Sequence, residues 1–174
     1  MDLHSFEDGD LYFEAPLAPE VMALLNQAAE AYGDGGAESF LMKARFMAPD
    51  NLMVLVALYR FYYYQHRYIE ALGIAEEALD VSGRMFGFDL GWRRMTLQHL
   101  SYGMVESFGM VRFYLLVLKG SGYLCLRLGE LEEGIDRLEK VVELDSPDRL
   151  GARSLLEVAY NQKGIYSLDQ RMSA

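Results

Sequence analysis

The stretch ALGIAEEALDVSG at residues 71–83 repeats the small residues of AESFLMKARFMAP at residues 37–49, with a spacing of 34 residues. Two alanines hold the same positions in each copy: Ala37 and Ala44 in the first, Ala71 and Ala78 in the second. Small residues seven apart share one helix face, where they let a neighbouring helix approach to about 8–10 Å between axes. A fixed period of this length is typical of stacked helical hairpins. The two stretches therefore predict an all-α array.

A third copy of the small-residue pattern, at Gly134 and Val141, comes 63 residues after the second instead of 34. The period is thus broken in the middle, and we interpret residues 86–114 as a degenerate helical pair. The predicted organisation is an acidic arm at 1–17 followed by a single domain at 18–174. Within the domain we expect units at 18–51, 52–85, 86–114 and 115–148, and a capping helix at 149–165.

Apolar periodicity and turn residues give the expected helices. These are a helix from Pro19 to the turn at Gly33, then 37–46, 52–65, 68–81, about 92–102, 104–128, 130–144 and 149–163. Asp148 is the expected N-cap of the last helix. The stretch 104–128 is read either as one helix or as two helices joined near Gly120-Ser121-Gly122.

Residues 128–134, LGELEEG, and 144–147, LDSP, resemble the inter-helix turn and the terminating element of the tetratricopeptide repeat (TPR) family. The segment YIEAL at 68–72 is similar to the same turn. Gly83 in place of the terminating proline is a departure from the family pattern. The resemblance implies a right-handed α-α superhelix of three to four helical hairpins with a C-terminal capping helix. It also implies a concave groove, lined by the first helix of each pair, that binds an extended peptide or a helix.

The resemblance places eight residues in this groove: Asn26, Arg60, Tyr63, Tyr64, Lys119, Tyr123, Arg127 and Arg153. Basic residues in an acidic protein would suit a carboxylate or an acidic motif. The alternative is that these side chains pair with local glutamates. One TPR subfamily clamps the carboxylate of chaperone tails with a lysine and an asparagine. Because Met22 occupies the lysine position beside Asn26, we do not expect that activity here.

The composition also restricts the class of partner and the cellular compartment that we expect. The formal net charge of −10 argues against nucleic acid, whose binding needs a clustered basic surface. The single Cys125 forms no intramolecular disulfide, and residues 1–16 lack the basic and apolar regions of a secretory signal, so we expect a cytoplasmic protein.

Charged residues interrupt the most apolar stretches, so we expect no membrane span. His, Cys and Gly spacings predict no metal, thiol or phosphate site, and no cofactor.

We therefore expect a non-catalytic protein-interaction module, an adaptor or assembly factor that binds a peptide or helix of a partner protein. One alternative is a secretion-type chaperone for an aggregation-prone client. A less favoured one is a small-ligand sensor or enzyme near Trp92, Arg93, Arg94 and His99. The acidic, aromatic arm is a candidate to lie in the groove of its own chain or of a second copy. Self-association through residues 104–118 also stays open, so a homo-oligomer is among the expectations.

Overall fold

Eight α-helices and one 3-10 turn form the part of the chain that the computed structural model describes, residues 17–33 and 35–164. The elements are α1 (Pro19–Glu30), α2 (Ala37–Met47), α3 (Leu52–Tyr64), α4 (Tyr68–Met85), η2 (Trp92–Arg94), α5 (Leu97–Glu106), α6 (Phe108–Leu128), α7 (Leu131–Leu144) and α8 (Ala152–Lys163). The predicted all-α class is confirmed. Apart from Leu17, the predicted acidic arm at 1–17 lies outside the described residues.

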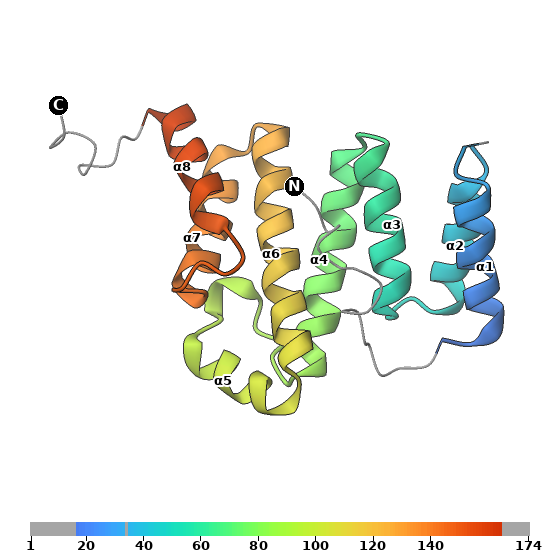
Figure 1. Cartoon of the computed structure of the whole chain (residues 1–174), viewed down its shortest axis with the longest axis horizontal. Helices are drawn as coiled ribbons and strands as arrows, with labels where there is room; N and C mark the ends of the chain where they lie inside the picture. Colours follow the sequence, from blue (N-terminus) through green and yellow to red (C-terminus); the bar gives the residue numbers. More distant parts are fainter. Residues whose placement is uncertain (1–16, 34, 165–174) are drawn as a thin grey trace, which may run out of the picture.

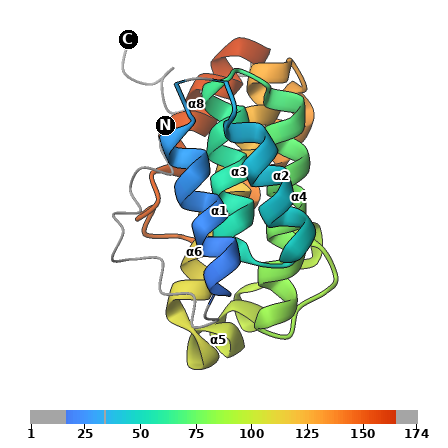
Figure 2. The ribbon, with the colours of Figure 1, turned by 90° about the vertical axis from the view of Figure 1, so that its right-hand side faces the viewer.

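The helices stand side by side in one row (Figure 1). Along the row, α1 packs on α2, α3 on α4, and α7 on α8, while α6 lies between α4 and α7 and contacts both. Seen from the α1 end, α1, α3 and α6 lie in one layer, and α2 and α4 lie in the other (Figure 2). Because α6 packs directly on α4, the segment between them is displaced from the row and forms an appendage around α5.

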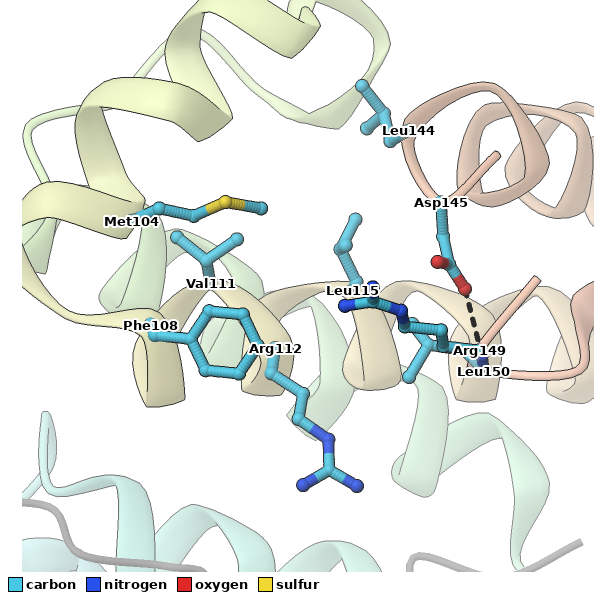
Figure 3. Close-up of a pocket in the computed structure, with 9 residues that line it drawn as sticks. All are labelled: Met104, Phe108, Val111, Arg112, Leu115, Leu144, Asp145, Arg149 and Leu150. Atoms are coloured by element: carbon cyan, nitrogen blue, oxygen red, sulfur yellow. Dashed lines mark hydrogen bonds between the residues drawn. The ribbon is translucent and has the colours of Figure 1, made fainter. Parts of the chain in front are cut away.

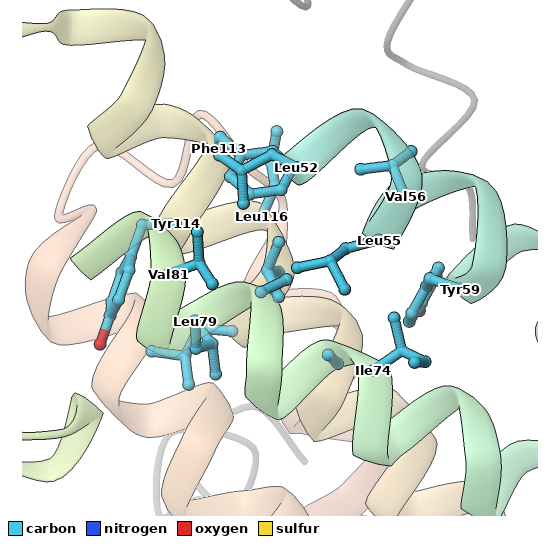
Figure 4. Close-up of a cluster of buried hydrophobic side chains, with 14 of the residues drawn as sticks. Leu52, Leu55, Val56, Tyr59, Ile74, Leu79, Val81, Phe113, Tyr114 and Leu116 are labelled. Atoms are coloured by element: carbon cyan, nitrogen blue, oxygen red, sulfur yellow. The ribbon is translucent and has the colours of Figure 1, made fainter. Parts of the chain in front are cut away.

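The small residues that repeat in the sequence lie where helices meet. Ala37, Ala44 and Ala71 are completely buried. At Gly134 on α7, an added Cβ would lie 2.6 Å from Leu126 Cδ2 of α6, closer than real Cβ contacts allow. Side chains of α3, α4 and α6 pack together in the core cluster that also contains Ala71 (Figure 4). Small side chains thus set the helix spacing, as the 34-residue pattern predicted.

The N-terminus of α3 is fixed by a capping side chain. Asn51 Oδ1 accepts hydrogen bonds from the backbone N–H groups of Met53, at 3.0 Å, and Val54, at 3.4 Å. Substitution Asn51→Ala removes this acceptor, and we expect the free energy of unfolding to fall by about 1 kcal/mol. Urea unfolding followed by circular dichroism measures the change. An unaltered midpoint would show that the cap contributes nothing to the stability of the array.

The stretch 104–128 is neither a single helix from residue 104 nor two helices joined at Gly120-Ser121-Gly122. One helix, α6, runs unbroken from Phe108 to Leu128. Its glycines serve packing instead of a turn. A Cβ at Gly120 would approach Tyr59 Oη to 3.1 Å, and one at Gly122 would meet Leu138 and Arg137 of α7 at 3.1 and 3.2 Å.

By length and composition, α6 is also the one helix in the described residues that could cross a membrane. However, 61% of its most apolar window is buried in the structure. Its position between α4 and α7 accounts for this composition, because a helix covered on several sides is apolar all round.

Residues 86–114, which we expected to form a degenerate helical pair, contain the turn η2, the helix α5 and the first turns of α6. The segment folds back on α4, since Phe88 N donates to Gly83 O at 2.8 Å. Thr96 and His99 form a capping box at the start of α5. The helix α4 therefore extends to Met85, beyond the expected end at residue 81.

The last helix starts later than expected, at Ala152 instead of residue 149, and Gly151 stands at its N-cap position. Asp148 still caps it from outside, because its Oδ1 accepts the backbone N–H of Ala152 at 2.8 Å and of Arg153 at 3.1 Å. The carboxylate thus satisfies two donors of the first turn.

Candidate functional site

Five tyrosine rings meet where α3 ends, α4 begins and α6 ends. We call them the tyrosine cluster: Tyr59, Tyr63, Tyr64, Tyr68 and Tyr123. Tyr63 is central, with ring centroids 6.0 Å from Tyr59, 5.5 Å from Tyr64, 6.0 Å from Tyr68 and 6.3 Å from Tyr123. Three of the predicted groove residues, Tyr63 and Tyr64 of α3 and Tyr123 of α6, are therefore members of one cluster.

Arg127 completes this cluster. Its guanidinium lies 4.8 Å from the centre of the Tyr68 ring and 5.9 Å from that of Tyr123, and its Nη1 donates to Tyr123 Oη at 3.0 Å. The hydrogen bond to Tyr123 raises the pKa of Arg127, so the charge is retained at every physiological pH. Because Arg127 is exposed, a carboxylate can approach its planar donor group from solvent.

Helical spacing and one backbone reversal build the cluster. Tyr59 and Tyr63 are four residues apart on α3, as are Tyr123 and Arg127 on α6, so each pair shares a helix face. Between α3 and α4 the chain reverses at His66, which has φ 57°. That reversal brings Tyr68 back to within 6.0 Å of Tyr63. Neither Tyr59 nor Tyr68 was among the predicted groove residues, although the four-residue spacing between Tyr59 and Tyr63 was a usable signal for Tyr59.

Arg60 and Tyr64 also line a cavity of about 580 Å³ between α1 and α3. Its remaining walls are mostly apolar or aromatic, and include Leu25, Tyr32 and Phe61. Asn26 is exposed on α1 but is not among the residues that line this cavity. Two predicted groove residues, Arg60 and Tyr64, therefore line this cavity, and Tyr64 also belongs to the tyrosine cluster. The third, Asn26, does not line it.

Lys119 and Arg153 are engaged elsewhere, at the connection between α7 and α8. Lys119 Nζ donates to the Leu150 carbonyl at 2.6 Å, and Arg153 Nη2 donates to the Ser146 carbonyl at 3.0 Å. Burial lowers the pKa of Lys119. Both cations thus donate hydrogen bonds to main-chain oxygens. This arrangement is neither the partner binding nor the pairing with glutamates that the sequence left open.

The residues of the alternative enzyme or sensor site are separated in the structure. Trp92 and Arg93 line a shallow hollow together with acidic residues of α7, and Arg94 and His99 are not part of it. His99 Nδ1 instead lies 2.8 Å from Thr96 Oγ1 in the cap of α5. Across residues 17–33 and 35–164, no group of three or more His, Cys, Asp or Glu is placed to hold a metal ion.

Trp92 instead takes part in a network around the buried Arg137. The Arg137 guanidinium lies 5.1 Å from the centre of the Trp92 ring. It forms ion pairs with Glu76 of α4 at 2.5 Å and Glu133 of α7 at 2.8 Å, and donates to Ser121 Oγ of α6 at 2.9 Å. One side chain therefore links α4, α6, α7 and the turn η2. Sequence reasoning missed it, because nothing in the pattern marks this arginine as buried.

Comparison with known proteins gave one informative relative, and no family model matches the chain. The chain is 52% identical over 158 residues to a protein of Azotobacter chroococcum mcd 1 described as "Uncharacterized 19.8 kDa protein in nifW 5′ region". The match covers 91% of this chain and 88% of that protein.

Proposed function

The chain belongs to one family with the 19.8 kDa protein of Azotobacter chroococcum, and we propose that it is a non-catalytic interaction module built as a TPR-like superhelix. The packing order supports this architecture. Helices α1 and α2, α3 and α4, and α6 and α7 form successive pairs along the row, and α8 covers the last of them. In such arrays each pair contacts its neighbours, and the first helices of the pairs present a continuous surface.

The ligand that fits this surface is an acidic peptide or helix with aromatic side chains. The tyrosine cluster with Arg127 carries this proposal, because it gathers four partly exposed rings, the buried ring of Tyr59 against Tyr63, and an exposed guanidinium from three helices. Tyrosine offers a large contact area at a low cost in conformational entropy, together with a hydroxyl for hydrogen bonds. Arg127 supplies two-point recognition of a carboxylate.

Charge reversal tests the proposal. We expect Arg127→Glu to weaken binding of an acidic aromatic peptide by about ten-fold or more, since a charged hydrogen bond is replaced by repulsion. Fluorescence anisotropy with labelled peptides gives the dissociation constants. The relative's gene lies in the nifW 5′ region, so the purified nifW product is the first whole protein to assay.

Arg94→Glu is the matched control, because Arg94 is also exposed and lies on η2, away from the cluster. It changes the net charge equally, so any general electrostatic effect appears in both variants. Equal weakening by Arg94→Glu, or undiminished binding by Arg127→Glu, would exclude the cluster as the binding site.

A further inference from the structure

A second cavity, of about 270 Å³, lies at the opposite end of α6 (Figure 3). It is enclosed by α5, the first turns of α6 and the connection between α7 and α8. Its apolar walls are Met104, Phe108, Val111, Leu115, Leu144 and Leu150. Its polar lining consists of Arg112, Arg149 and Asp145, and Asp145 Oδ2 accepts the Leu150 N–H at 2.8 Å. The cavity is therefore an apolar site whose polar lining consists of two arginines and one carboxylate.

The surface beside this cavity exposes large apolar side chains. Val105 is 85% exposed, Tyr102 67% and Phe108 57%, all within the end of α5 and the start of α6. Scattered apolar residues are normal on protein surfaces, but Phe108 also lines the cavity, as does Met104, which is 44% exposed, and exposed apolar side chains at a cavity mark a candidate interaction site. A segment that covers this site must therefore bring apolar side chains.

Electrostatics indicates the charge of that segment. Arg112 projects from α6 and Arg149 lies beside Leu115 (Figure 3). In the described part of the chain, Arg149 takes part in no ion pair. Two arginines at an apolar cavity in a chain of net charge −10 favour an acidic, apolar occupant.

Residues 1–16 have this composition. They include five carboxylates and no lysine or arginine, together with apolar and aromatic residues: Leu3, Phe6, Leu11, Tyr12 and Phe13. We propose that residues 1–16 dock on the cavity of their own molecule, with aromatic side chains on its apolar walls and carboxylates against Arg112 and Arg149.

The position of α1 allows this docking. Helices α1, α3 and α6 all begin at the end of the array where α5 lies, so residue 17 enters α1 on the side of the cavity (Figures 1 and 2). Sixteen extended residues reach about 50 Å. Passing from α1 across α3 to α6 takes about 20–30 Å at ordinary helix spacings.

This site is separate from the tyrosine cluster. Arg112 and Arg127 are 15 residues apart on α6, which corresponds to about 22 Å along the helix axis. Failure of the self-docking proposal would therefore leave the proposed function standing, and the reverse also holds.

Paramagnetic relaxation measured by NMR tests the proposal. A nitroxide is attached to the full-length Ser5→Cys variant, and it broadens the signals of isotope-labelled methionine methyl groups that lie near it. Cys125 is completely buried and therefore does not compete for the label, and burial also raises the pKa of its thiol to about 11. We expect loss of the Met104 methyl signal, while Met42 and Met47 on α2 keep theirs. Restoration of the Met104 signal by Arg112→Glu with Arg149→Glu is also expected, with no restoration by the control pair Lys43→Glu and Arg94→Glu.

Three outcomes would overturn self-docking. The first is an intact Met104 signal in the labelled chain. The second is equal restoration by both pairs of charge reversals, provided circular dichroism shows unchanged helicity. The third comes from mixing the spin-labelled chain, without isotope label, with an isotope-labelled chain without nitroxide. Loss of the Met104 signal in that mixture would place the segment on a second copy instead of its own molecule.

Discussion

Arg137→Ala is expected to lower the free energy of unfolding by about 3 kcal/mol. Removing one partner of a buried ion pair costs about 3–5 kcal/mol. The lower end applies here because Glu76 and Glu133 keep 42% and 29% of their side-chain surface exposed, and water partly replaces the lost guanidinium. The Arg137 side chain itself is only 7% exposed. Its loss also removes the contact with Trp92 that attaches η2 to α7.

Urea unfolding monitored by circular dichroism and by the fluorescence of Trp92 measures this change. Arg84→Ala is the control, because the Arg84–Asp50 ion pair is 3.7 Å long and well exposed, and its removal should alter stability by less than about 1 kcal/mol. Arg137→Lys should fall between alanine and wild type, since it keeps the charge without the forked geometry. If Arg137→Ala unfolds at the wild-type midpoint, the network does not hold the array together.

Gly83→Ala and Gly73→Ala are expected to change stability in opposite directions, although both lie within α4. A Cβ at Gly83 would lie 2.6 Å from the carbonyl oxygen of Phe88, a residue whose backbone N–H donates to the Gly83 carbonyl oxygen. Overpacking of this kind costs about 1–3 kcal/mol or more, and the gain in helix propensity returns about 1 kcal/mol. We expect a net destabilisation of about 2 kcal/mol, with displacement of the segment that leads to α5.

At Gly73 no atom lies within 4 Å of the added Cβ. The propensity gain then acts alone, and Gly73→Ala should stabilise the protein by about 1 kcal/mol. The midpoints of thermal and urea unfolding of the two variants, measured in the same buffer, test both expectations. Stabilisation by both would mean that Phe88 does not lie against α4 as described.

Helix positions could be predicted because they depend on local signals. The spacing of the small residues, the turns and the proline at residue 49 gave α2, α3 and α7 to within two residues at either end. The region between α4 and α6 could not be predicted in the same way. Its path is set by long-range contacts, such as the position of Trp92 beside Arg137, 45 residues further along the chain. No sequence period records such contacts.

The candidate site was predicted in part for the same reason. The TPR resemblance placed Tyr63, Tyr64, Tyr123 and Arg127 on one surface, and in the structure these four side chains lie together. The engagement of Lys119 and Arg153 depends on the shape of the α7–α8 connection, which places the carbonyls of Leu150 and Ser146 within their reach. Two of the basic residues on the predicted groove face therefore donate to main-chain oxygens of their own chain.

Photo-crosslinking in the native cell tests the proposed binding surface most directly. A photoreactive phenylalanine analogue replaces Tyr64 in the full-length chain, and in a control chain it replaces Arg94 on η2. Mass spectrometry then identifies the attached peptides. We expect the Tyr64 position to capture peptides of a partner protein rich in Asp or Glu with aromatic residues. We expect Arg127→Glu to abolish this capture, and the Arg94 position to capture none of these peptides. Capture of the same peptides at both positions, or at Tyr64 regardless of Arg127→Glu, would contradict the proposed binding surface.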